Sequence, residues 1–298
     1  MQQHFQLGCQ MSVPEWIEFN RSEIFENAEL AKYAAPFPPF ELMRNTTGLQ
    51  TQVDFASHGA DIYKALSDAS LIPLSNFKHI LDFGCGCGRL ARMFKGHAGR
   101  LSGCDIDSRH VEWMQENIKY MDVKLSSVVP PIPFKDNEVD CVISISIFTH
   151  LTEKSQDQFL AELHRVADPD GYLFITVHGQ RALDRAISEP TIRAMLDMEE
   201  SRFQHAQKNF SQNQHAFVLQ HGHLTNVLQE NISPLEVIKQ FAKSIFKRKA
   251  ITESFEYGIT FVPEAYLRNH WGKWFDVVDY RYGGIHDFQD IVVLKPKK

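Results

Sequence analysis

The chain has few features that would place it in a membrane, outside the cell or on a nucleic acid. Its longest apolar stretch, CVISISIF at 141–148, is far shorter than the about 20 residues of a membrane-spanning helix. The N-terminal segment MQQHFQLGCQMSVPEW lacks the basic and then apolar pattern of a secretory signal. A formal net charge of -6 argues against a general polyanion binder. These absences favour a cytoplasmic protein that binds no nucleic acid.

Cysteine is scarce and shows no spacing typical of disulfides or metal sites. The five cysteines in 298 residues are an odd, unpatterned set, which favours reduced thiols. Cys85 and Cys87 alternate with glycines, and we interpret them as small side chains in a crowded turn rather than metal ligands. Internal repeats and low-complexity tracts are also absent. We therefore expect an ordinary globular enzyme or binding protein without a metal site.

One segment concentrates the glycines, HILDFGCGCGRLARMF at 79–94. The apolar residues before Gly84 predict a buried strand, and residues 89–95 carry the apolar spacing of a helix. Glycine permits positive φ angles and a close approach of the backbone to a ligand. A strand, a glycine turn and a helix in this order form the ligand crevice at the carboxyl edge of a doubly wound sheet.

Predicted strands and helices alternate on both sides of this segment, which indicates a mostly parallel sheet. Strands are expected over 80–83, 101–105, 123–125, 139–144 and 172–177, and helices over 89–95, 110–118 and 156–165. The pattern divides the chain into an N-terminal helical lid (1–76), a core (77–179), a helical cap (180–256) and a return to the core (257–298). In the cap, 181–210 and 233–250 are expected to be helical, and two strands at 275–284 and 287–298 close the chain as a hairpin.

The glycine spacing separates two classes of nucleotide cofactor. A dinucleotide fingerprint requires G-x-G-x-x-G, whereas here the third glycine comes one position early, which disfavours a nicotinamide oxidoreductase. The pattern Asp82-x-Gly84-x-Gly86-x-Gly88 resembles the first motif of class I S-adenosylmethionine-dependent methyltransferases. LSGCDID, PPIPFKDNEVDCVIS, ISIFTHL and FLAELHRVADPDGYLFIT resemble later segments of that family, in the same order.

The resemblance implies an α/β fold of the Rossmann-like type, with a seven-stranded, mostly parallel sheet in the order 3-2-1-4-5-7-6. Strand 7 would be antiparallel, and helices would cover both faces. The implied cofactor is S-adenosyl-L-methionine, converted to S-adenosyl-L-homocysteine. The entry and closing segments also resemble uncharacterised bacterial members associated with glycan or secondary-metabolite assembly.

The resemblance also assigns residues to the cofactor. The glycine turn would lie against the methionine part, through Gly84, Cys85, Gly86 and Gly88. Asp82 would hold the ammonium group, and Asp105 would accept hydrogen bonds from the ribose hydroxyls. The remaining implied contacts are Ile106 on the adenine, Val128 and Val129 where many members carry an acidic residue, and Ser144 and Ile145 at the end of the fourth strand.

Residues outside the motifs are candidates for the acceptor side. His150 and His178 follow strands at the carboxyl edge and are candidate general bases, with a packing or capping role as the alternative. Arg44 is a candidate for the cofactor carboxylate, and Tyr257 for the acceptor pocket, with surface and packing roles as their alternatives.

Two further signals lie in the predicted cap. His215, His221 and His223 come without a placed carboxylate and indicate polar surface more than a metal site. Residues 239–250 are basic with interleaved apolar side chains, so an anionic carrier or a membrane surface is an alternative to a solvated helix.

The expected reaction is O-methylation of a hydroxyl on a sugar or small metabolite. N- or C-methylation of a small molecule and a non-catalytic cofactor-binding scaffold stay open, because a fold does not fix a function.

Overall fold

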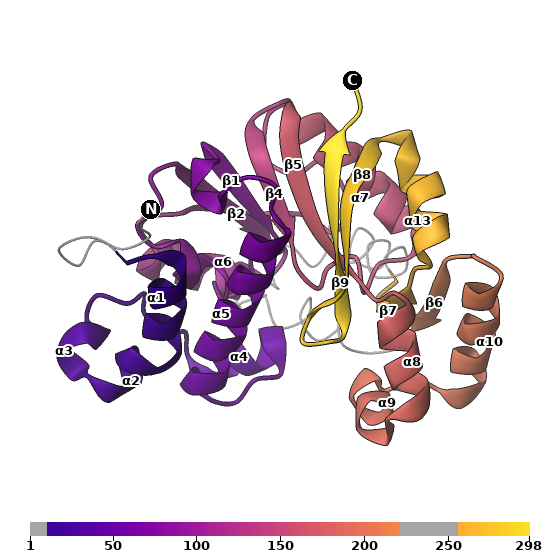
Figure 1. The fold of residues 1–298 in the computed structure, drawn as a ribbon, viewed down its shortest axis with the longest axis horizontal. Helices are drawn as coiled ribbons and strands as arrows, with labels where there is room; N and C mark the ends of the chain where they lie inside the picture. The colour runs from indigo at the N-terminus through magenta and orange to yellow at the C-terminus, as the bar shows by residue number, and fades with distance from the viewer. Residues whose placement is uncertain (1–10, 221–255) are drawn as a thin grey trace, which may run out of the picture.

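The computed structural model describes residues 11–220 and 256–298 and contains a seven-stranded sheet in the order β3-β2-β1-β4-β5-β9-β8 (Figure 1). Only β9 is antiparallel to its neighbours β5 and β8; the other adjacent strands are parallel. The strands are β1 (His79–Phe83), β2 (Arg100–Asp105), β3 (Asp122–Leu125), β4 (Val139–Ser144), β5 (Ala167–Val177), β8 (Phe275–Ile285) and β9 (Gln289–Pro296). The predicted fold class and strand order are confirmed.

Helices cover both faces of the sheet because each central strand is apolar on both sides. On one face, Ile80 and Ile143 pack against the N-terminal helices and α6. On the other face, Leu81 and Val142 pack against α7 and α13. The N-terminal helices are α1 (Val13–Glu18), α2 (Ile24–Glu26), α3 (Ala28–Ala31), α4 (Phe40–Thr47) and α5 (Gln52–Ala69), and the others are α6 (Ser108–Asn117), α7 (Glu153–Val166) and α13 (Glu264–His270).

The region after β5 has a small core of its own. It contains α8 (Gln180–Ser188), α9 (Pro190–Leu196), α10 (Glu200–Ser211) and a two-stranded sheet of β6 (Ala216–Leu219) and β7 (Gly258–Phe261). The predicted helix over 181–210 is therefore three helices, since Pro190 starts a new one and Asp197 adopts a left-handed φ of 46°. The β6–β7 pairing was not predicted. The predicted helix over 233–250, His221 and His223 lie outside the described residues.

The predicted helix over 89–95 was wrong. Only Ala91–Phe94 form one turn of 3₁₀ helix. Two carbonyls that a continuing α-helix would use internally are occupied by distant side chains. The Trp16 indole donates to the Met93 carbonyl (2.8 Å), and the Tyr120 hydroxyl donates to the Ala91 carbonyl (3.0 Å). Tertiary contacts therefore override the local helical pattern.

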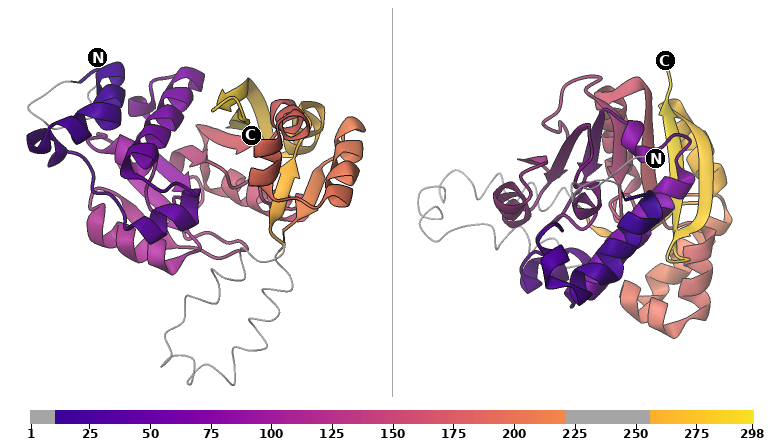
Figure 2. Two further views of the ribbon diagram at one scale, coloured as in Figure 1. Left: turned by 90° about the horizontal axis from the view of Figure 1, so that it is seen from below. Right: turned by 60° about the vertical axis from the view of Figure 1, so that its left-hand side comes forward.

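The carboxyl ends of the parallel strands meet at one edge of the sheet, where the tip of the β8–β9 hairpin also lies. The N-terminal helices lie on one side of this edge, and α8–α10 lie on the other (Figures 1 and 2). None of the helices within 11–220 and 256–298 has the length and apolar character of a bilayer span. The fold thus leaves the carboxyl edge between two helical groups.

Candidate active site

Three connected cavities lie along the carboxyl edge. The inner cavity (about 200 Å³) adjoins the glycine turn, and the side cavity (about 210 Å³) adjoins the ends of β1 and β2. The outer cavity (about 1070 Å³) extends towards α9 and β6. Thr46, Ser146 and Tyr257 line all three cavities, so they stand where the cavities join.

The glycine turn forms the floor of the inner cavity. Gly84 has a φ of 79°, and a Cβ atom there would lie 2.2 Å from Ile147 Cδ1. The backbone N–H groups of Gly84 and Cys85 both donate to the Cys104 carbonyl, at 2.9 and 3.1 Å. The turn is thereby fixed to the end of β2. Cys85 and Ile145 line the inner cavity, whereas Gly86 and Gly88 face Thr46 and Met114.

Two carboxylates lie on this floor. Asp82 is 6% exposed, and burial, together with the nearby Asp105 charge, raises its pKa to about 7 against the opposing effect of Arg89. Asp105 accepts hydrogen bonds from the backbone N–H groups of Gly86 (2.8 Å) and Asp107 (2.9 Å). Each carboxylate oxygen can accept a further hydrogen bond. Asp105 therefore both holds the turn and keeps acceptor capacity for a ligand.

Arg89 lies at the junction of the inner and outer cavities, directly after the glycine turn. Among the described residues, its guanidinium has no hydrogen bond or ion pair with a protein group, although the Asp82 charge is near. Arg44 is instead exposed and lines only the outer cavity, with its guanidinium 5.8 Å from the centre of the Phe40 ring. The arginine at the inner cavity is thus a residue that the sequence argument did not select.

The side cavity is mainly apolar. Its walls include Phe83, Ile106, Val128, Ile147 and Phe159. The buried hydroxyl of Ser126 also lines it and has no strong hydrogen-bond partner among the described residues. Of the remaining predicted contacts, Val129 is 41% exposed and Ser144 is fully buried, and neither lines any of the three cavities. The shape suits a flat apolar group with a polar edge.

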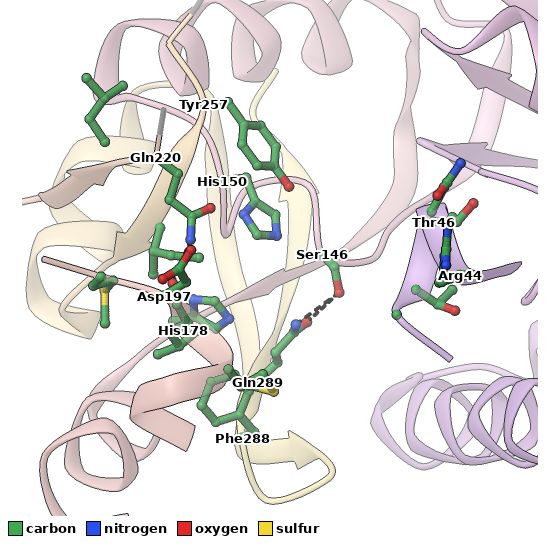
Figure 3. Close-up of a pocket in the computed structure, with 18 of the residues that line it drawn as sticks. Arg44, Thr46, Ser146, His150, His178, Asp197, Gln220, Tyr257, Phe288 and Gln289 are labelled. Atoms are coloured by element: carbon green, nitrogen blue, oxygen red, sulfur yellow. Dashed lines mark hydrogen bonds between the residues drawn. The ribbon is translucent and has the colours of Figure 1, made fainter. Parts of the chain in front are cut away.

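His150 and His178 both line the outer cavity (Figure 3). The His150 ring stacks on Tyr257 at 4.7 Å, and its Nδ1 lies 2.8 Å from the Gly258 carbonyl. That contact fixes Nδ1 as the protonated nitrogen, so the neutral ring carries its lone pair on Nε2. His178 is 2% exposed, and burial, with a smaller contribution from His150, lowers its pKa to about 3.

Ser146 is a central residue that sequence reasoning missed. It has a left-handed φ of 60°, its backbone N–H donates to the Thr176 hydroxyl, and its own hydroxyl pairs with the Gln289 amide (Figure 3). Backbone strain of this kind concentrates at functional sites. No sequence signal marks Ser146, since its conformation depends on β5 and β9. Thr46 was missed for the same reason: its hydroxyl lies 2.9 Å from His110 Nε2 across the inner cavity.

Part of the chain that forms this site is similar to known proteins. Residues 81–175 match a family model described as a methyltransferase domain. This segment of the chain is therefore similar to a methyltransferase domain. A Pyrococcus horikoshii structure shares its fold, with a TM-score of 0.56 at 14% identity over 87% of this chain and 98% of the other.

The curated relatives match between 33% and 36% of this chain. A probable S-adenosylmethionine-dependent methyltransferase of Mycolicibacterium smegmatis is 28% identical over 33% of this chain and 37% of that protein. An Arabidopsis thaliana tRNA (carboxymethyluridine(34)-5-O)-methyltransferase is 30% identical over 36% of this chain. The Escherichia coli cyclopropane-fatty-acyl-phospholipid synthase is 26% identical over 35%. The matched segments span 26% to 37% of these three relatives.

The cofactor of the methyltransferase domain is S-adenosylmethionine, and the residues present fit it. The inner cavity offers carboxylates and an arginine to a zwitterionic amino acid, and the side cavity offers apolar walls to an adenine. Gly84 and Ile147 line both cavities, and a side chain at residue 84 would collide with Ile147. Among the described residues, no group of three or more His, Cys, Asp or Glu side chains is arranged to hold a metal ion.

Proposed function

We propose that the protein transfers a methyl group from S-adenosylmethionine to a hydroxyl of a sugar or another small molecule, with His150 as the general base. The observation that carries this proposal is the position of His150. Its ring lines both the side and the outer cavities, and its Nδ1–H group is held by the Gly258 carbonyl. Nε2 is then the nitrogen that can take a proton from an acceptor hydroxyl.

The cofactor contacts follow from the two smaller cavities. S-adenosylmethionine, when bound, supplies an electrophilic methyl group on a sulfonium. Asp82 holds the ammonium group, Arg89 holds the carboxylate, and Asp105 accepts hydrogen bonds from the ribose hydroxyls. Ile106 and Val128 pack on the adenine. The supporting observations are the burial of Asp82, the Arg89 guanidinium, which is unpaired within 11–220 and 256–298, and the apolar walls of the side cavity.

His178 is less suited to the role of base. Its pKa near 3 makes the neutral ring a weak proton acceptor at physiological pH. A general base works best with a pKa near the pH at which the enzyme operates. We therefore assign proton transfer to His150 alone and leave His178 a different role on the same cavity wall.

The helical groups on either side of the carboxyl edge act as a lid and a cap. Thr46, near the end of α4, closes one side, and the end of α9 with the two residues after it, Leu196 to Met198, closes the other. Their role is to align the acceptor and exclude water, since methyl transfer is an in-line displacement that needs alignment above all. The Arabidopsis relative is named for methylation of an oxygen, which supports an oxygen acceptor over a nitrogen or carbon acceptor.

The test is a screen for transfer of labelled methyl from S-adenosylmethionine to small-molecule fractions, followed by His150→Gln. We expect the variant to lose turnover by about 10²–10⁴-fold, because the hydroxyl proton lacks an acceptor. Its Kd for S-adenosylhomocysteine should stay within about twofold, and the exposed His205→Gln variant should behave as wild type.

Three outcomes would contradict parts of this proposal. Normal turnover in His150→Gln would show that His150 is not the general base. Cofactor binding without any labelled product would favour the scaffold alternative, and a labelled amine or carbon would favour N- or C-methylation.

A further inference from the structure

A buried histidine ring lines the outer cavity. His178 is 2% exposed, lines the cavity, and its Nδ1 has no hydrogen-bond partner among the described residues. The other ring nitrogen donates to the backbone of Thr260. In the neutral ring, Nδ1 is then the nitrogen that carries a lone pair. A buried acceptor without a donor is costly, so a molecule that supplies a donor here is favoured.

Two further acceptors lie on the same side of the cavity (Figure 3). The Gln220 amide N–H donates to the Leu196 carbonyl at 2.6 Å, which leaves the amide oxygen as an acceptor. The Asp197 carboxylate, next in sequence to Leu196, also lines the cavity. With His178 Nδ1, these groups form an acceptor wall, defined here as His178, Asp197 and Gln220. Its partner must bring hydrogen-bond donors.

The charges of the cavity favour a neutral donor. Arg44, Arg89 and Arg202 line it together with Asp197 and Glu199. Glu199 is already paired with Arg202 at 3.0 Å, so among the lining residues that the structure describes the remaining positive side chains balance or exceed the negative one. A cation would therefore gain little electrostatic attraction in this cavity, whereas hydroxyl groups supply hydrogen-bond donors without a charge. The low pKa of His178 keeps its ring a neutral acceptor.

The spacing of the two imidazoles sets how the hydroxyls are arranged. The ring centres of His150 and His178 lie 6.4 Å apart. Two hydroxyl groups on adjacent carbons of one molecule fit this spacing. Each hydroxyl can then form a hydrogen bond of about 2.8 Å to one of the two rings. We infer that the acceptor is a 1,2-diol, whose second hydroxyl donates to His178 Nδ1 while the first faces His150. This inference rests on the proposed function and names its substrate class.

The first experiment measures binding rather than turnover. The full-length protein, loaded with S-adenosylhomocysteine and labelled with ¹⁵N-histidine, is titrated with catechol, phenol, 1,2-cyclohexanediol, cyclohexanol and cyclohexylammonium. We expect the His178 Nδ1 resonance to move saturably with both diols. Each diol should bind about threefold to tenfold more tightly than its mono-hydroxy counterpart, the worth of one hydrogen bond. An unmoved Nδ1 resonance, equal affinities, or tighter binding of the ammonium would overturn the inference.

Two variants separate recognition from folding. In His178→Phe the preference for diols should fall below about twofold, and in His178→Gln, whose amide oxygen can accept, part of it should return. Both should bind S-adenosylhomocysteine as wild type does. A diol preference that survives in His178→Phe would overturn the inference. If wild type shows the preference but transfers no methyl group, the diol site stands and the proposed function fails. If it transfers methyl to mono-hydroxy compounds equally well, the inference alone fails.

Discussion

Asp82 is the residue whose ionisation should be visible in cofactor binding. Burial holds its pKa near 7, so much of the free protein carries a neutral carboxyl group below that pH. An ammonium group in the inner cavity favours the ionised form, and binding must then release a proton. We expect the Kd for S-adenosylmethionine to rise by up to about tenfold per pH unit below pH 7, with proton release in calorimetry. The dependence should vanish in Asp82→Asn. A Kd that is flat from pH 8 to pH 6 would contradict this role.

The same shift has a consequence for stability. With a pKa of about 7 in the folded state against 3.8 for a model carboxyl, the unfolded chain loses its proton first as the pH rises. Folding stability should therefore fall between about pH 4 and pH 7 and stay reduced above it. Asp82→Asn removes this cost, so the variant should gain a few kcal/mol at pH 8 and little at pH 4. Urea unfolding at pH 4 and pH 8 measures this change in the free energy of unfolding, with the exposed Asp68→Asn variant as the control.

The glycine turn tolerates no side chain at residue 84 without a change in the cavities. In Gly84→Ala the new methyl meets Ile147, which must move into the cavities that it lines. We expect the Kd for S-adenosylhomocysteine to rise at least about tenfold. Gly48→Ala is the matched control: its φ is also left-handed (71°), but no atom lies within 4 Å of the new Cβ. It should lose about 1–2 kcal/mol of stability and keep its cofactor affinity. Equal losses of affinity in both variants would mean that backbone strain, and not the collision with Ile147, weakens cofactor binding.

The elements that could be predicted are those whose local pattern agrees with their packing. The strands of the core and the closing hairpin follow from apolar runs, and their order follows from the family motifs. The segment after Gly88 could not be predicted, because Trp16 and Tyr120 reach its carbonyls from far along the chain. Arg89 carried a signal, since it directly follows the glycine turn, but Ser146 and Thr46 gain their positions only from tertiary contacts.

At the scale of the molecule, the N-terminal helices should respond to the cofactor before the cap does. Thr46 of α4 contacts both His110 and the glycine turn. Binding at the inner cavity should therefore stabilise this helix in its present position. We expect S-adenosylhomocysteine to slow hydrogen exchange over residues 40–47 and to leave residues 200–211 unchanged until a diol is added. Exchange mass spectrometry measures both segments in one run. Unchanged exchange over 40–47 with saturating ligand would contradict a lid there.

In the proposed function, the carboxyl edge combines two lengths of chain with separate roles. The inner and side cavities are built mainly from residues 82–151, while the acceptor wall comes from residues 178–220. Mutations in the second length can therefore accumulate without disturbing the methyl donor. Related proteins can in this way keep the same methyl donor while mutations in the cap change the acceptor that they bind. In the laboratory, the segment from Gln180 to Gln220 is accordingly the place to randomise when a different acceptor is wanted.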